Sequence, residues 1–190
     1  VYRGEAQQPA TAVLSSSLYY DGTIKGYSYN LTRAAQEFQQ VPGLWDAGFT
    51  MTIVYGVSSS ASVWPELVKA AVENLNSKFH VALTAVPWQY YIRALHDQQL
   101  SIFMLGFLAD YPDAHNFACE FYHSSRFYAK SQGYSNSAMD ELIMAGADEL
   151  DPAKRANIYR NIQVLAIEDC ASVPVVQPTG RHFEKTRVKG

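Results

Sequence analysis

An aspartate that interrupts an apolar run is the leading candidate for a functional residue in this chain. Asp110 follows the β-prone residues 101–105 and comes just before Pro112-Asp113, a pair that cannot continue a β-ladder. We therefore expect Asp110 to lie where a strand ends and the chain turns outward. Ligands of α/β proteins bind at the carboxyl ends of strands, which favours a binding role. The alternative is a turn carboxylate that hydrogen-bonds only to nearby main chain.

Three side chains farther along could hold a metal ion. His115, Cys119 and His123 are spaced four residues apart, so on a helix they would share one face with Glu120 and could bind zinc or nickel. The segment starts in a proline turn, however, and need not be helical. We therefore favour solvated histidines and expect neither a metal nor a cofactor.

Catalytic signatures are absent from the sequence. It contains no G-x-S-x-G, no H-E-x-x-H, no phosphate-binding loop and no G-x-G-x-x-G, and its serine, histidine and aspartate residues are scattered. The sequence therefore predicts a protein that is not an enzyme.

Composition is typical of one compact domain. The chain has 190 residues, of which 48% are hydrophobic and 17% charged. The net charge of −3 does not attract the phosphate groups of a nucleic acid, so we expect no nucleic acid partner. Basic residues gather only at positions 181–189, where we expect a solvated tail, and no apolar run is long enough to span a bilayer.

Strand and helix patterns alternate along the chain. Residues 1–26, rich in Gly, Ser, Thr, Gln and Pro, predict an extended entry segment rather than a packed element. We expect strands at 49–55, 81–86, 101–107 and 173–177, and helices at about 30–41, 63–79 and 89–96. Two further helices are expected, one from Ser137, with a Ser137–Asp140 capping box, and one from Asp151, with Pro152 in its first turn. Such alternation favours a largely parallel sheet flanked by helices.

The block Gly106-Phe107-Leu108-Ala109-Asp110-Tyr111-Pro112 resembles a family motif. It is similar to the G-W-x-A-D-Y segment of the oligopeptide/dipeptide/nickel-binding family of ABC transporter extracellular solute-binding proteins (family 5). Further motifs follow in the same order: Tyr134-Ser135-Asn136, Met139-Asp140, Asp151-Pro152 with Arg155 and Tyr159, and Val173-Pro174. The resemblance extends from about Tyr27 to about Lys189.

The resemblance implies an α/β fold that is one lobe, the C-terminal one, of a periplasmic-binding-protein type II fold. Residues 1–26 would then be the entry segment and residues 27–190 a single α/β lobe. Because family members are much longer and this sequence begins at Val1, we expect an excised lobe whose partner lobe is missing. The implied protein acts in the periplasm or outside the cell, closes about a hinge, and delivers its solute to a membrane-bound ABC permease.

The resemblance also implies roles for individual residues. It places at Asp110 the acid that pairs with the amino terminus of a peptide or peptide-like solute, and at Phe107 an aromatic that packs on the ligand. Where peptide-binding relatives can carry an arginine, this chain has Met104, which leaves the ligand class open. Trp88 could line the same cleft, although an aromatic there is also typical of a core.

Two alternatives stay open at this point. Cys119 and Cys170 are the only cysteines, and in an exported protein they could form a disulfide or be unrelated thiols. A disulfide would exclude Cys119 as a metal ligand. The rival function is an extracellular sensory or interaction module built on the same fold.

Overall fold

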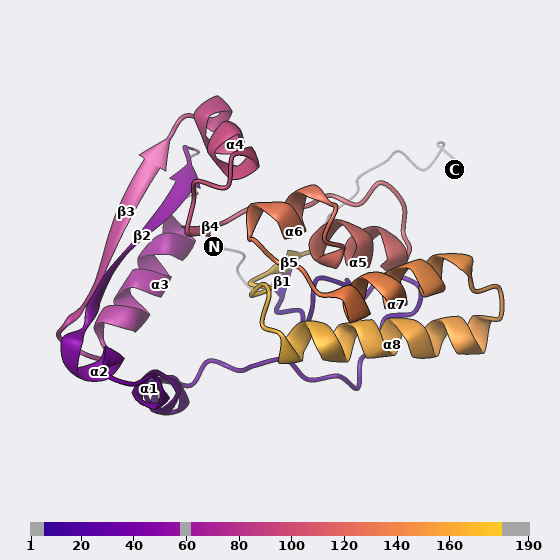
Figure 1. The fold of residues 1–190 in the computed structure, drawn as a ribbon, viewed down its shortest axis with the longest axis horizontal. Helices are drawn as coiled ribbons and strands as arrows, with labels where there is room; N and C mark the ends of the chain where they lie inside the picture. Colours follow the sequence, from indigo (N-terminus) through magenta and orange to yellow (C-terminus); the bar gives the residue numbers. More distant parts are fainter. Residues whose placement is uncertain (1–5, 58–61, 180–190) are drawn as a thin grey trace, which may run out of the picture.

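The computed structural model describes residues 6–57 and 62–179, which form a sheet half and a helical half side by side (Figure 1). The basic residues 181–189 lie outside the described residues. The elements of the sheet half are α1 (Leu31–Gln40), α2 (Leu44–Ala47), β2 (Phe49–Gly56), α3 (Val63–Glu73), β3 (Phe79–Val86), α4 (Trp88–His96) and β4 (Ile102–Phe103). Those of the helical half are α5 (Ala114–Tyr122), α6 (Phe127–Ser131), α7 (Ser137–Asp148) and α8 (Pro152–Glu168), and β1 (Ala6–Gln7) pairs with β5 (Gln177–Pro178).

The sheet half is built on three parallel strands in the order β3-β2-β4. The register pairs Phe49 with Phe79 at one end and Gly56 with Val86 at the other, and β4 joins β2 beside Ile53 and Val54. Exposure alternates along the first half of each long strand, and Ile53, Phe79 and Val81 are buried. Helix α3 packs against β3. The carboxyl ends of all three strands therefore meet at one edge.

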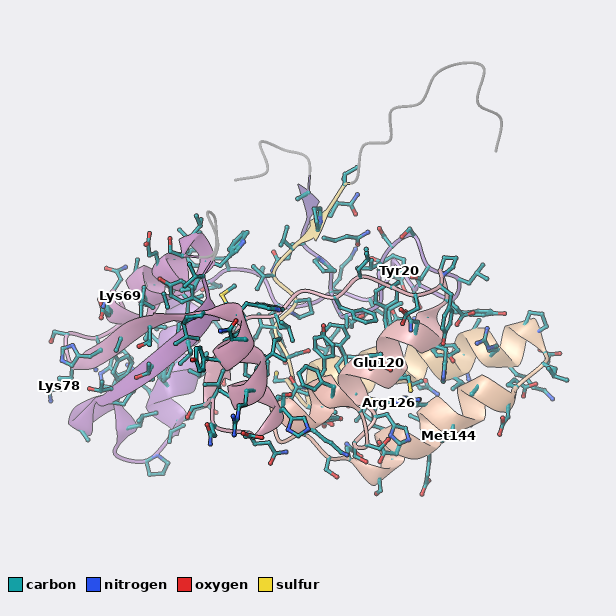
Figure 2. All side chains as sticks on the ribbon, turned by 90° about the horizontal axis from the view of Figure 1, so that it is seen from above. Tyr20, Lys69, Lys78, Glu120, Arg126 and Met144 are labelled. Carbon is teal, nitrogen blue, oxygen red and sulfur yellow. The ribbon has the colours of Figure 1, made fainter. Side chains whose placement is uncertain are left out.

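The helical half encloses a second core. The antiparallel helices α7 and α8 pack along each other, and α5 packs against both (Figures 1 and 2). Its fully buried side chains come from all three helices, and the largest are Phe117, Tyr122, Met139, Ile143, Tyr159 and Ile162. The sheet half, marked by Lys69 and Lys78 in Figure 2, lies beyond one end of this bundle.

The N-terminal segment, expected to be extended rather than packed, runs through several turns between residues 10 and 24, and part of it is packed. Ala12 and Val13 are buried in the second core, and the main-chain N–H of Ala12 donates to the hydroxyl of the buried Tyr122 at 3.0 Å. Arg160 on α8 forms an ion pair with Asp21 of the same segment. Residues 11–24 are thus a structural part of the helical half.

Most expected elements are present, with two differences of length. The helix expected to reach Phe79 ends at Glu73, because Asn76 turns the chain: its side chain accepts from the amide of Lys78 and its carbonyl accepts from the amide of Phe79. The strand expected over 101–107 pairs only at Ile102 and Phe103. After these two residues the chain leaves the sheet.

Two local predictions are corrected. Asn136, rather than Ser137, caps α7 through its side-chain oxygen, and Asp140 instead accepts hydrogen bonds from the amide and hydroxyl of Ser124. The last strand is Gln177–Pro178 instead of 173–177. Asp151 with Pro152 starts α8 as expected. None of the helices among the described residues is long and apolar enough to cross a membrane.

We predict that Val13→Ala lowers the free energy of unfolding by about 2 kcal/mol, because it removes two fully buried methyl groups and leaves a cavity. The matched control is Val173→Ala, since the Val173 side chain is 80% exposed and should cost almost nothing. Urea denaturation followed by circular dichroism measures both. Equal, small effects of the two substitutions would mean that the N-terminal segment does not contribute to the core.

Candidate functional site

The main chain between β4 and α5 begins at the carboxyl end of β4 and is largely unpaired among the described residues. Among the described residues, no group pairs with the main-chain N–H or C=O of Leu105, Phe107, Leu108 or Ala109. The carbonyl of Gly106 accepts from the Tyr128 hydroxyl at 2.7 Å. We call residues 105–109 the open segment. It crosses from the sheet half to the helical half (Figure 1).

The start of the open segment is fixed by a buried tyrosine. The hydroxyl of Tyr91, on α4, accepts from the amide of Met104 at 2.9 Å and donates to its carbonyl at 2.5 Å. Burial raises the pKa of Tyr91, so the hydroxyl keeps the proton that it donates. Trp88 lies beside the Tyr91 ring, with centroids 5.8 Å apart, and remains 58% exposed above Gly56. The structure thus brings Met104 and Trp88 together through Tyr91.

Phe107 lies in the middle of the open segment and points into the second core. Its ring contacts Phe117, Phe121 and Tyr128 edge-on, with centroids 5.6, 5.7 and 5.6 Å away. The ring therefore anchors the segment to α5 and α6, while its main chain stays open.

Asp110 ends the open segment and is exposed. Its amide donates to Oδ1 of Asn116 at 2.9 Å, and its Oδ2 accepts from Nδ2 of Asn116 at 3.3 Å. No other side chain among the described residues hydrogen-bonds to its carboxylate. Asp110 is both a turn residue and an accessible carboxylate at the end of the open segment.

Asp113, three residues farther on, has a different role. It caps α5 by accepting from the amide of His115, and both of its carboxylate oxygens accept from Arg155, at 2.8 and 3.1 Å. Arg155 also donates through Nε to the carbonyl of Gly146 on α7. One guanidinium therefore joins α5, α7 and α8.

Two tyrosine rings and a histidine complete this cluster. The guanidinium lies 4.7 Å from the ring centroid of Tyr19 and 5.1 Å from that of Tyr159, and the two rings stack on each other. The Tyr159 hydroxyl lies 3.0 Å from Nδ1 of His115. In the sequence, Arg155 and Tyr159 were recognised only as part of the family resemblance, and no role was predicted for them. Their spacing of four residues puts both on one face of α8 and could have indicated a shared partner.

The electrostatics of the cluster follow from its partial burial. Burial alone would raise the pKa of Asp113, but the hydrogen bonds from Arg155 and the His115 amide outweigh it and hold that pKa below its usual value. Burial is also the main cause that lowers the pKa of His115, opposed by Asp113 and supported by Arg155. His115 is therefore held neutral.

The geometry supports neither a metal site at His115, Cys119 and His123 nor a disulfide between Cys119 and Cys170. Nδ1 of His115 faces Tyr159 and Nδ1 of His123 faces Ser125, at 3.0 Å each, and no trio of His, Cys, Asp or Glu within residues 6–57 and 62–179 could hold a metal ion. Of the two alternatives for the cysteines, the structure has the separate thiols: Cys119 is a buried free thiol on α5, whereas Cys170 is a free, exposed thiol after α8. The two thiols belong to different environments.

One serine–histidine–aspartate group does assemble. Ser125 Oγ lies 3.0 Å and Asp140 Oδ1 lies 3.8 Å from His123, but both face the same ring nitrogen, Nδ1. A catalytic triad uses the two ring nitrogens for two different partners. This group cannot relay a proton in that way.

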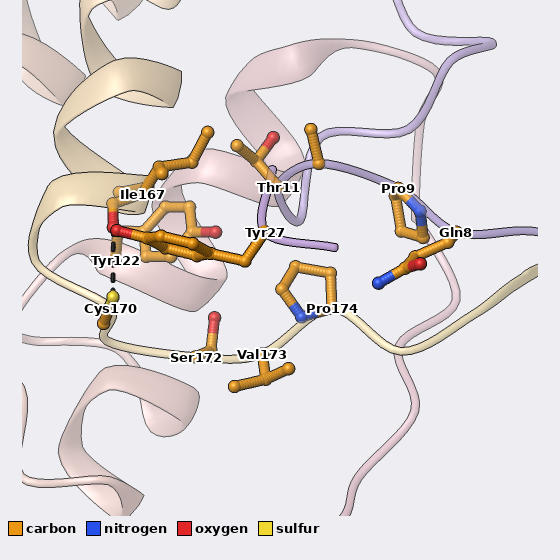
Figure 3. A pocket seen from close by; sticks show the side chains of 12 residues that line it. Gln8, Pro9, Thr11, Tyr27, Tyr122, Ile167, Cys170, Ser172, Val173 and Pro174 are labelled. Carbon is orange, nitrogen blue, oxygen red and sulfur yellow. Dashed lines mark hydrogen bonds between the residues drawn. The ribbon is translucent and has the colours of Figure 1, made fainter. Parts of the chain in front are cut away.

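A small cavity lies elsewhere, between the N-terminal segment and the end of α8 (Figure 3). It measures about 60 Å³, and the Cys170 thiol at its wall donates to the carbonyl of Ile167 at 3.2 Å. Small-molecule sites usually measure roughly 300–1,000 Å³. The cavity is too small for a peptide. A larger and more open hollow of about 360 Å³ lies at the starts of β2 and β3, beside Phe49 and Lys78. It is at the amino ends of these strands, whereas ligands of α/β sheets bind at the carboxyl ends, where the open segment begins.

Comparison with known proteins identifies the class of fold. No family model matches the chain. The oligopeptide-binding protein OppA of Bacillus subtilis is 24% identical over 199 residues, which cover 100% of this chain and 36% of that protein. A Helicobacter pylori periplasmic binding protein, DppA, solved with the peptide STSA, superposes with a TM-score of 0.81 at 21% identity over 94% of this chain and 35% of that one. A solved peptide ABC transporter peptide-binding protein has a TM-score of 0.80 at 20% identity, and there the match covers 81% of that chain.

These likenesses confirm the resemblance found in the sequence and the predicted fold. The chain is similar over its whole length to a family 5 peptide-binding protein, and its fold is an α/β lobe of the periplasmic-binding-protein type II class. The chain spans about a third of the length of the curated relatives that it matches.

We predict that stability falls on mild acidification because of His115. Its pKa is lower in the folded state than in the unfolded chain, where it is about 6.5, so the unfolded state takes up a proton first as the pH falls from about 7.5 to about 5.5. Over this range the free energy of unfolding should decrease, and His115→Asn should flatten the decrease. Urea titrations at several pH values measure it, with His80→Asn, at an exposed residue on β3, as the control. An unchanged slope in His115→Asn would contradict the assignment.

Proposed function

We propose that this chain is the ligand-binding lobe of an ABC transporter solute-binding protein and that it holds peptides or peptide-like solutes on the open segment. The observation that carries the proposal is the main chain of residues 105–109, which is unpaired among the described residues except at the Gly106 carbonyl and is followed by the exposed carboxylate of Asp110. Both features offer what a peptide with a free amino terminus needs.

The main chain of the open segment suits an extended peptide. A peptide laid beside residues 105–109 would pair its own N–H and C=O groups with theirs, as an added strand does at an open edge. Such bonds do not depend on the ligand's side chains. The exposed surfaces of Trp88 and Leu108, 58% and 90% accessible, offer apolar contacts to those side chains.

The charge at the end of the segment suits the ligand's amino terminus. A carboxylate that receives an α-ammonium forms a charge-assisted hydrogen bond, which is stronger when water is excluded. On this chain alone the site is open on one side. We infer that a second lobe of the full-length protein closes over the ligand about a hinge and excludes water, and that the closed protein presents the ligand to an ABC permease outside the cytoplasm without catalysis.

We predict that Asp110→Asn in the two-lobed protein weakens binding of a free-amine tripeptide by at least tenfold, because loss of one partner of a desolvated charge pair costs about 2–5 kcal/mol. N-acetylation of the tripeptide should weaken binding to the wild type by a similar factor and should hardly affect Asp110→Asn. Isothermal titration calorimetry measures all four affinities. Asp148→Asn, an exposed carboxylate on α7, is the control. If acetylation weakens both proteins equally, Asp110 does not contact the amine.

A further inference from the structure

Two aspartates lie three residues apart on the same turn, and their carboxylates are held in opposite ways. Both oxygens of Asp113 accept hydrogen bonds from the Arg155 guanidinium, which also neutralises the negative charge of this carboxylate. Asp110 is held only by the neutral amide of Asn116. Only Asp110 therefore keeps its negative charge available for a ligand.

Asn116 is held in place by burial and by its hydrogen bonds. The residue is 5% exposed, on the first turn of α5, where an amide without partners would be costly. Its Oδ1 accepts from the amide of Asp110 and its Nδ2 donates to Oδ2 of the same residue. Because a main-chain N–H needs an acceptor, the bond from Asp110 fixes which end of the Asn116 amide carries the oxygen.

We propose that Asn116 is a positioning residue, which orients the Asp110 carboxylate so that its free oxygen, Oδ1, receives the amino terminus of the ligand. The inference rests on the proposed function. The exposed Asp110 side chain would otherwise move among rotamers, and a ligand would have to bear the entropy of ordering it. Asn116 orders the carboxylate in advance through a neutral donor and adds no positive charge that would compete with the ligand.

A role of Asn116 in folding alone makes a different prediction. Loss of a buried hydrogen-bonded amide destabilises the turn, and a general loss of this kind would weaken binding of every ligand alike. A positioning role acts through Asp110 and therefore concerns only ligands with a free amino terminus. The ratio of the affinities for a free and an N-acetylated tripeptide separates the two roles.

The test measures this ratio in the two-lobed protein for the wild type, Asn116→Ala, Asp110→Asn and the double variant. Asn116→Ala should reduce the wild-type preference for the free amine about tenfold and leave the affinity for the acetylated peptide unchanged. In the Asp110→Asn background the same substitution should change nothing further, because the two residues act through one carboxylate. Asn116→Ser, which keeps a polar group at the buried position, gives the same readout if Asn116→Ala does not fold.

The matched control is Asn136→Ala. Like Asn116, Asn136 accepts from main-chain amides with its side-chain oxygen, in its case as the cap of α7, and its Nδ2 donates to Asp169 instead of Asp110. Its loss should lower stability and leave the preference for the free amine intact. If Asn116→Ala keeps the wild-type ratio of affinities for the free and the acetylated tripeptide, which includes the case in which it loses affinity for both equally, the positioning role is overturned. The proposed function then still stands. A wild type without any preference for the free amine overturns the proposed function itself.

Discussion

The bidentate ion pair between Arg155 and Asp113 is the interaction on which the arrangement of the helical half depends. Each partner is 18% exposed at its side chain, so the pair is largely removed from water and each charge needs the other. The planar guanidinium satisfies two oxygens of Asp113 and the carbonyl of Gly146 at once, which a lysine ammonium could not match geometrically. The start of α5 is thereby held against α7 and α8.

Fixing the start of α5 also fixes the end of the open segment. The segment is held at Met104 by Tyr91, in its middle by the Phe107 ring and the Tyr128 hydroxyl, and at Asp110 by Asn116. These anchors use side chains and leave most of the main chain of residues 105–109 unpaired. A segment whose position is already fixed in this way costs a ligand little ordering entropy on pairing, which is the physical basis of the proposed binding mode.

The architecture could be predicted from the sequence more fully than the side-chain contacts could. Periodicity located the parallel strands and most helices, and the family motif led to the Asp110 turn. The partners of these residues could not be predicted, since Asn116 meets Asp110 only because α5 begins at Ala114, and Arg155 meets Asp113 only because α8 packs beside α5. The apolar spacing that extended the predicted helix to Phe79 was real, but Phe79 is buried as the first residue of β3. A pair of cysteines in a sequence carries no information on distance, and here the two thiols are free.

The most direct test of the account is a crystal structure of the two-lobed protein with a free-amine tripeptide. The account predicts that the ligand nitrogen lies within hydrogen-bond distance of Asp110 Oδ1 and that the ligand main chain pairs with residues 105–109 as an added strand. A tripeptide bound between the lobes while the main chain of residues 105–109 stays unpaired would contradict it.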